Sequence, residues 1–168
     1  MKQKMRTKEE MVKYLRCFSK GQITGSPCPV AKRLLKEGQW FSGRSAVSEC
    51  ELTLSWSRKM RPRAGECFYN AQKFCLANTT FNYFEGYYFI GGFPMPHAWV
   101  VGADSNVVDF TIEVVLRNAI RNKTVYDARP PLYRGLKIDT TLLRLRFESR
   151  PKSPNPLREP YLFSNLRC

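Results

Sequence analysis

Three strand-like segments between residues 80 and 110 do most to limit how this chain can fold. TFNYFEGYYFI (80–90) is rich in aromatic residues, HAWVVGA (97–103) follows the turn GGFPMP, and NVVDF (106–110) overlaps the tight turn ADSN. Aromatic and β-branched residues favour strands, and short turns join neighbouring antiparallel strands. The segments therefore predict an antiparallel meander of about three strands.

Four other segments have the apolar spacing of amphipathic helices. They are TKEEMVKYLRCFSK (7–20), PVAKRLLKEG (29–38), ECFYNAQKFCLAN (66–78) and TIEVVLRNAIRNK (111–123). In the first, Thr7 and Glu10 have the spacing of a capping box. The third precedes the meander directly, so we expect it to pack on the sheet.

The remaining segments are less distinctive. CELTLSW (50–56) alternates apolar and polar residues, which predicts a half-buried strand, with a helix as the alternative. DARPPLYRG (127–135) has the composition of a loop, and DTTLLRLRF (139–147) fits a strand or a helix. The four prolines after residue 150 predict an extended arm.

The length of 168 residues and a hydrophobic content of 43% predict one domain with a real core, residues 1–168. Within it we expect N-terminal helices and one strand (1–60), a core that carries Cys, His and Asp (64–112) and a proline-rich C-terminal arm (150–168). No apolar run is long enough for a membrane span, and the N-terminus lacks the apolar stretch of a signal peptide. The default expectation is a cytoplasmic protein without a membrane partner.

The charge balance is strongly basic. Lys and Arg number 28 against 14 Asp and Glu, a net charge of +14, and the densest runs are RKMRPR (58–63) and RLRFESRPK (144–152). Such an excess indicates an anionic partner, which could be nucleic acid, an anionic membrane surface or an acidic protein. A solvated basic surface without a specific partner is the alternative.

The six cysteines do not have the spacing of a metal site. The sequence contains no CxxC motif and only one histidine, so it predicts neither a zinc site nor another metal or cofactor. Without a signal peptide, we expect free thiols rather than disulfides.

Cys67, His97 and Asp109 follow one another on a helix, a strand and the next strand. Cys67 lies near a predicted helix N-terminus, where the anionic form of a thiol is stabilised. His97 opens one strand and Asp109 closes its antiparallel neighbour, so the carboxylate could orient the ring. Each residue also has a plain structural interpretation: a core cysteine, a buried histidine and an N-cap of the helix near residue 111.

The residues around these three resemble the transglutaminase-like core of the papain-like cysteine enzymes. The matching pieces are GECFYNA (65–71), EGY (85–87), HAW (97–99) and DFT (109–111), and they cover about residues 64 to 112. The layout is similar to that of small bacterial and phage-type proteins. The chain departs from the family pattern at Phe110, where proline is common, and at Glu85, where arginine often stands.

The resemblance implies an α+β fold in which the cysteine-bearing helix packs on a small antiparallel sheet. It implies that Cys67 is the nucleophile, His97 the base and Asp109 the group that orients it. Substrates would be amides or thioesters, in a reaction of protease, isopeptidase, deamidase or transglutaminase type that passes through an acyl-enzyme.

Four further residues are candidates for substrate binding. Asn70 lies one helical turn after Cys67, Glu85 and Tyr87 lie on the aromatic strand, and Trp99 follows His97 on its strand. Asn70 could instead cap a buried backbone group, Glu85 could pair with an arginine, and Tyr87 could belong to the core.

Three kinds of function remain open at the level of sequence. The first is a cysteine hydrolase or acyltransferase acting on a protein or peptide amide. The second is a basic module that keeps the same fold and binds nucleic acid or an acidic protein without catalysis, through its cations and aromatic rings. The third is a structural protein without an active site.

Overall fold

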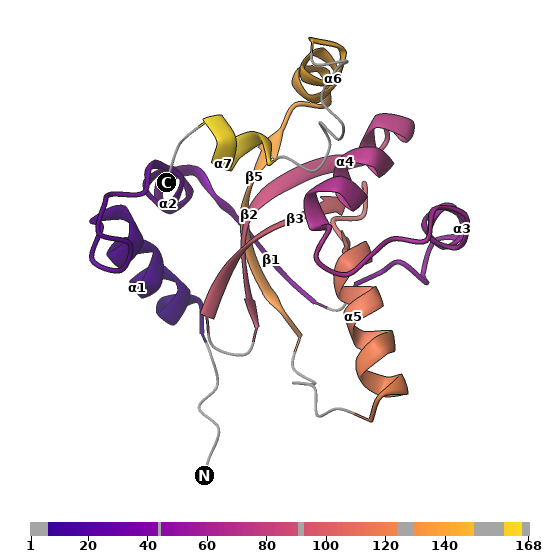
Figure 1. Ribbon diagram of the computed structural model, residues 1–168, viewed down its shortest axis with the longest axis horizontal. Helices are drawn as coiled ribbons and strands as arrows, with labels where there is room; N and C mark the ends of the chain where they lie inside the picture. The colour runs from indigo at the N-terminus through magenta and orange to yellow at the C-terminus, as the bar shows by residue number, and fades with distance from the viewer. Residues whose placement is uncertain (1–6, 44, 91–92, 124–129, 150–159, 166–168) are drawn as a thin grey trace.

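A computed structural model of the protein describes residues 7–43, 45–90, 93–123, 130–149 and 160–165. The fold is mixed α+β, as expected (Figure 1). The helices of the described part are α1 (Lys8–Ser19), α2 (Pro29–Glu37), α3 (Glu51–Met60), α4 (Cys67–Ala77), α5 (Phe110–Arg121), α6 (Thr140–Ser149) and α7 (Tyr161–Asn165). The strands are β1 (Gln39–Ser42), β2 (Asn82–Ile90), β3 (Phe93–Val101), β4 (Val107–Val108) and β5 (Leu132–Ile138).

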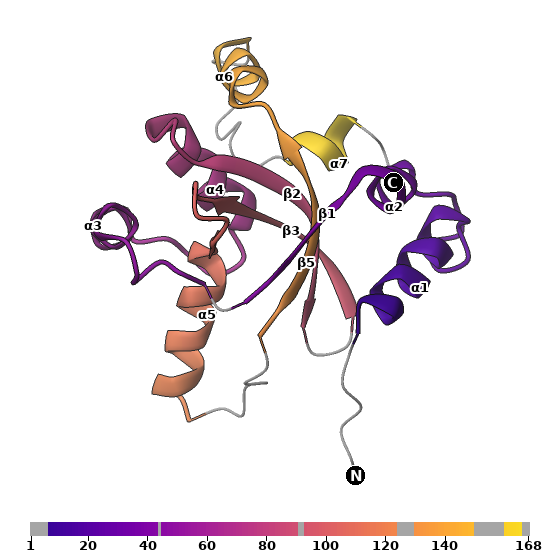
Figure 2. The ribbon, with the colours of Figure 1, turned by 180° about the vertical axis from the view of Figure 1, so that it is seen from behind.

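The five strands form one antiparallel sheet in the order β1-β5-β2-β3-β4. The sheet is strongly curled, like half of a barrel, with α1 and α2 beside each other at one side and α3, α4 and α5 at the other (Figures 1 and 2). The predicted meander is confirmed as β2, β3 and β4. β3 begins earlier than expected, at Phe93, and β4 is only two residues long.

The prediction of a loop over residues 127–135 is wrong for its last part, because β5 lies in the middle of the sheet between β1 and β2. Tyr133 and Gly135 face one side of the sheet and Arg134 and Leu136 the other, and all four are buried. A strand buried on both faces lacks the polar alternation that marks a half-buried one, so its pattern reads as irregular.

The prediction of a strand over residues 50–56 is also wrong, since this segment begins α3. The Thr53 hydroxyl donates to the carbonyl oxygens of Val47 at 2.7 Å and Cys50 at 2.8 Å, which fastens the first turn. The buried residues of α3 are Thr53 and Ser57, four apart, as a helix requires. The apolar alternation of the sequence therefore does not mark the buried face.

The other helix predictions are confirmed, including the capping box of Thr7 and Glu10 on α1. The ambiguous segment 139–147 is helical and forms most of α6. Of the predicted C-terminal arm, only residues 160–165 belong to the described part, and they include α7 rather than extended chain. Among the described residues, no helix is both long and apolar enough to span a membrane.

The core has one cluster on each face of the sheet. The larger cluster joins α1, α2 and α4 to one face, through residues such as Tyr83, Tyr87 and Val100. The smaller one joins Phe84, Trp99 and Tyr133 on the opposite face. α4 packs against β3 and β2, which brings the N-terminus of this helix to the sheet.

Four described cysteines, Cys17, Cys50, Cys67 and Cys75, carry free thiols. Cys28 departs from the expectation of free thiols, because it is disulfide-bonded. Its sulfur also accepts a hydrogen bond from the Ala31 N–H at the start of α2.

Candidate functional site

Cys67 is the first residue of α4 and is half-buried. The chain reaches it through Gly65, whose φ of 79° lies in the left-handed region that glycine adopts without steric cost. This turn sets the start of α4, where the N–H groups of the first helical turn have no partner within the helix. The sulfur therefore lies at the positive end of the helix dipole.

His97 lies in the interior of β3, opposite Gly86 of β2, and its side chain is 4% exposed. Gly86 places no side chain beside the ring. A Cβ at this position would collide with the backbone of Arg134 and Gly135 on β5, so glycine is required here. Tyr88 packs on the imidazole with ring centroids 4.4 Å apart, and Trp99 stacks at 6.4 Å. These neighbours exclude water from the ring and fix its orientation.

Asp109 combines the two roles that the sequence left open. Its Oδ1 accepts the N–H groups of Thr111 at 3.1 Å and Ile112 at 3.0 Å, so it is the N-cap of α5. Its Oδ2 lies 2.6 Å from His97 Nε2 and accepts the Tyr133 hydroxyl at 3.0 Å. The cap fixes the carboxylate, which leaves the second oxygen to orient the imidazole.

The backbone of Asp109 is held as firmly as its side chain. Ser45 Oγ accepts the Asp109 N–H at 2.8 Å and donates to the Asp109 carbonyl oxygen at 3.2 Å. Both residues are buried. The carboxylate is therefore fixed from three directions, by Ser45, by the first turn of α5 and by Tyr133.

The charges around His97 favour its protonated form. Burial alone would lower the pKa of this imidazole, but the Asp109 carboxylate outweighs burial, and hydrogen bonding with Cys67 adds to the rise, so the pKa reaches about 10. Cys67, His97 and Asp109 are thus brought together in the order that the sequence suggested. Because Nε2 is bonded to Asp109, Nδ1 is the ring nitrogen left to exchange a proton with the Cys67 sulfur.

The four candidate substrate-binding residues are buried and make contacts within the fold. Asn70 is buried, and its Nδ2 donates to the Arg63 carbonyl oxygen at 2.9 Å and to Thr111 Oγ1 at 2.8 Å, which ties α4 to α5. Trp99 is fully buried beneath the site, and its Nε1 has no hydrogen-bond partner among the described residues.

Glu85 and Tyr87 lie on the sheet face opposite to His97. Glu85 is completely buried and accepts the N–H groups of Tyr161 at 2.5 Å and Leu162 at 2.6 Å, so it holds the start of α7. Tyr87 stacks on Phe18 at 5.7 Å. Both side chains therefore support the packing of helices on the sheet.

Two residues that hold the site, Tyr133 and Ser45, were not predicted to contact Asp109. Tyr133 belongs to a segment that was assigned to a loop, and the signal for a strand in LYRGLKI is weak because Arg, Gly and Lys interrupt its Leu, Tyr and Ile residues. Ser45 lies in a connection without regular structure, and the sequence around it gives no indication of its contact with Asp109.

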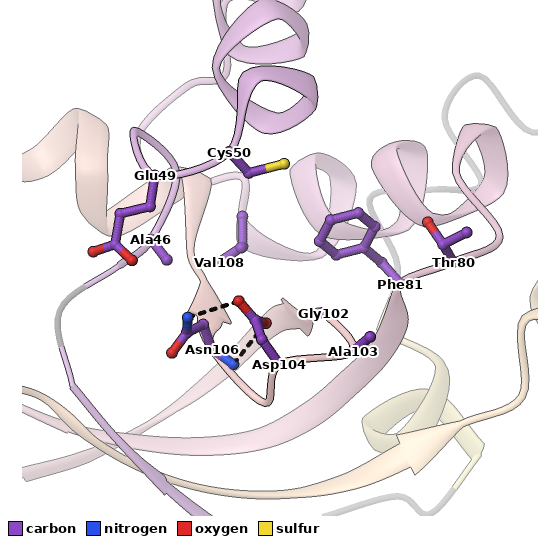
Figure 3. A pocket seen from close by; sticks show the side chains of 10 residues that line it. All are labelled: Ala46, Glu49, Cys50, Thr80, Phe81, Gly102, Ala103, Asp104, Asn106 and Val108. Carbon is purple, nitrogen blue, oxygen red and sulfur yellow. Dashed lines mark hydrogen bonds between the residues drawn. The ribbon is translucent and has the colours of Figure 1, made fainter.

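A second thiol, Cys50, lines a separate pocket of about 280 Å³ next to the β3–β4 turn. Its sulfur points into the pocket, which also holds Asp104 and Asn106 (Figure 3). The backbone N–H groups of Thr53 and Leu52 lower the pKa of this thiol, and the Asp104 charge opposes them. No histidine lines this pocket, so Cys50 has the helix N-terminus without a base.

No three His, Cys, Asp or Glu side chains of the described part of the chain lie close enough together to hold a metal ion. Comparison with protein families, curated proteins and solved structures finds no match for this chain. The function is therefore inferred from the geometry of the site and from the motifs between residues 64 and 112.

Proposed function

We propose that the protein is a cysteine-dependent hydrolase or acyltransferase that acts on a protein or peptide amide through an acyl-enzyme on Cys67. The observation that carries the proposal is the buried pair of His97 Nε2 and Asp109 Oδ2, 2.6 Å apart, next to a half-buried thiol at a helix N-terminus. Nucleophile, base and orienting group in hydrogen-bond contact are the arrangement that thiol catalysis needs. The motifs that resemble a transglutaminase-like core support the same conclusion.

In the first half of the reaction, the Cys67 sulfur attacks the carbonyl carbon of the amide and forms a C–S bond. His97 holds the proton taken from the thiol and gives it to the leaving nitrogen, so that the C–N bond breaks and an amine or ammonia departs. In the second half, His97 takes a proton from water or from an acceptor amine as this attacks the thioester. The C–S bond then breaks and the thiol is restored.

The negative oxygen of the tetrahedral intermediate needs hydrogen-bond donors. The Cys67 N–H is one candidate, because it lies in the first turn of α4 and donates to no described residue. Asn70 is a poor candidate, since both N–H bonds of its amide are directed at Arg63 and Thr111. The start of α4 therefore supplies both the nucleophile and the stabilising dipole.

A purely structural role accounts less well for this pair. Replacing a buried ion pair with apolar side chains is often neutral or stabilising, so a His–Asp pair is not an efficient way to hold a core together. The N-cap of α5 needs only one Asp109 oxygen. The position of the second oxygen against the only histidine is what catalysis would require.

The non-catalytic binding module needs aromatic faces open to a ligand. The aromatic residues Phe84, Trp99 and Tyr133 are in the core, as are Tyr83 and Phe74. Phe93 and Phe147 are exposed, so these two rings and the basic charge are what remains in support of the nucleic-acid alternative.

An activated acyl donor tests the proposal without knowledge of the natural substrate. We expect p-nitrophenyl acetate to release about one equivalent of nitrophenol in a burst and to leave an acetyl group on Cys67, detected by mass spectrometry, before slower turnover. Cys67→Ala should abolish the burst, and His97→Asn should slow it by on the order of a hundredfold or more. Cys17→Ala is the matched control. A burst that survives Cys67→Ala would refute the proposal.

A further inference from the structure

A pocket of about 440 Å³ lies between the C-terminal end of α3 and the first two turns of α4. Three cationic side chains line it, Arg61, Arg63 and Lys73, together with one carboxylate, Glu66. The pocket is open to solvent on one side and has Asn70 in its wall. Its lining is mostly polar, so it fits a charged group better than an apolar one.

The pocket adjoins the candidate active site through the backbone and through hydrogen bonds. Glu66, which lines the pocket, directly precedes Cys67. Asn70 donates to Thr111 Oγ1, and the Thr111 N–H in turn donates to Asp109 Oδ1. A group bound in the pocket would therefore lie next to the helix turn that presents the nucleophile.

The arginines of the pocket have no carboxylate partner in the described part of the chain. Neither Arg61 nor Arg63 forms an ion pair there, in contrast to Arg33 and Arg117, which pair with glutamates four residues away. Arg61 also has a left-handed backbone, with φ at 49°, where α3 ends. Two guanidinium groups without a carboxylate partner among the described residues form a site for an anion at this pocket.

The aromatic rings of the pocket favour a carboxylate ligand over a nucleic acid. The ring centroid of Trp56 lies 4.5 Å from that of Phe110 and 5.3 Å from that of Phe74, so the ring packs against the core. Lys73 Nζ donates to the Tyr69 hydroxyl at 2.8 Å and lies 5.0 Å from the ring centroid, so a cation already occupies the hydroxyl end of Tyr69. A base would need a free aromatic face on which to stack. A carboxylate needs only the planar guanidinium donors.

We propose that this pocket is a substrate subsite that binds an acidic side chain, Asp or Glu, close to the reactive amide of a protein substrate. The inference rests on the proposed function and names its substrate class, a protein segment with acidic residues. It also gives the basic surface a partner, since a chain with a net charge of +14 attracts acidic segments over a distance.

Binding of fluorescein-labelled hexaglutamate to the full chain tests the subsite. We expect hexaglutamate to bind in a salt-sensitive way and uncharged hexaglutamine to bind at least about tenfold more weakly. The variant with Arg61→Ala and Arg63→Ala should lose about tenfold in affinity for hexaglutamate. Arg58→Ala with Lys59→Ala is the matched control, because these two cations belong to the same helix end and do not line the pocket. The single variant Arg63→Gln leaves the left-handed Arg61 in place and should show a smaller loss.

The binding measurement is repeated with Cys67→Ala, which separates the subsite from the chemistry. Binding that persists there supports the subsite even if p-nitrophenyl acetate gives no burst. In the native chain, hexaglutamate should also slow the alkylation of Cys67 by iodoacetamide, as a ligand beside the nucleophile would. Equal losses in the control pair, equal binding of hexaglutamine, or tighter Arg61- and Arg63-dependent binding of hexathymidylate would overturn the proposal.

Discussion

The two oxygens of the Asp109 carboxylate serve different neighbours, and this division links the fold to the site. Oδ1 holds the first turn of α5, while Oδ2 meets His97 and Tyr133. A side chain that caps a helix cannot rotate away without breaking the hydrogen bonds that it accepts from the backbone N–H groups of the first turn. The orientation of His97 is therefore maintained by secondary structure and not by the ion pair alone.

The protonated His97 should make stability depend on pH. Its pKa in the folded protein is raised to about 10 from the ordinary 6.5, so its contribution is fully present below pH 6.5 and is lost as the pH rises through 10. We expect the difference in unfolding free energy between the native chain and His97→Asn, measured in urea, to shrink over this interval. NMR titration of the only histidine measures the same pKa directly. A difference that stays constant from pH 6.5 to pH 10 would contradict this assignment.

The proximity of His97 and Asp109 could be predicted because a short turn connects the strands that carry them, whereas the docking of the helix that carries Cys67 could not. His97 and Asp109 are twelve residues apart, on adjacent antiparallel strands or just beyond them. Tyr133 and Ser45 reach Asp109 from 24 and 64 residues away. Contacts at such separations depend on the strand order of the whole sheet, which local patterns do not specify.

At the scale of elements, α7 is held by a buried carboxylate. Glu85 accepts the N–H groups of Tyr161 and Leu162 and the Tyr83 hydroxyl at 2.6 Å, so all its partners are donors. Burial raises the pKa of Glu85 against the effect of these hydrogen bonds. Phe163 on the same helix packs against Phe68, the residue after Cys67. The C-terminal helix thus supports the start of α4 from the side.

Glu85→Gln should destabilise the protein by about 1–3 kcal/mol. The NH2 group of the new amide is a donor and must face a backbone N–H or a hydroxyl that also donates. Unfolding in urea measures this loss, and proteolysis of the C-terminal segment should become faster. Glu113→Gln is the control, since Glu113 lies on α5 with its oxygen 3.8 Å from Arg117 Nε at the surface. We expect that control to change stability by less than about 0.5 kcal/mol. An equally stable Glu85→Gln variant would show that Glu85 does not hold α7.

The helices with one apolar face and the aromatic strands were predicted well, and α3 and β5 were predicted poorly. α1 and α2 have caps and an apolar stripe that agree. α3 buries two hydroxyl residues, Thr53 and Ser57, so its apolar residues give the wrong period. β5 is buried on both faces. In both failures the packing of neighbours overrides the local pattern.

At the scale of the whole molecule, the curled sheet brings β3, β5 and the start of α5 around one imidazole, while α4 approaches from the side (Figure 1). The chain carries a net charge of +14, and the cationic pocket places part of that charge beside the helix turn of Cys67. An enzyme built in this way would select acidic protein segments by charge and act on an amide held next to α4.

The catalytic role of His97 is tested most directly by the rate at which iodoacetamide alkylates each free thiol. Mass spectrometry follows this rate for each cysteine at a series of pH values. Cys50 is the internal control, since it also lies at a helix N-terminus but has no histidine in its pocket. A thiol of ordinary pKa, about 8.5, reacts slowly at about pH 6, and the lowered pKa of Cys50 makes it a stricter reference than such a thiol. We expect iodoacetamide to alkylate Cys67 faster than Cys50 at about pH 6. The substitution His97→Asn should lower the alkylation rate of Cys67 to that of Cys50 and leave the rate of Cys50 unchanged. Equal rates for the two thiols, or a Cys67 rate that does not depend on His97, would contradict a catalytic role for the histidine.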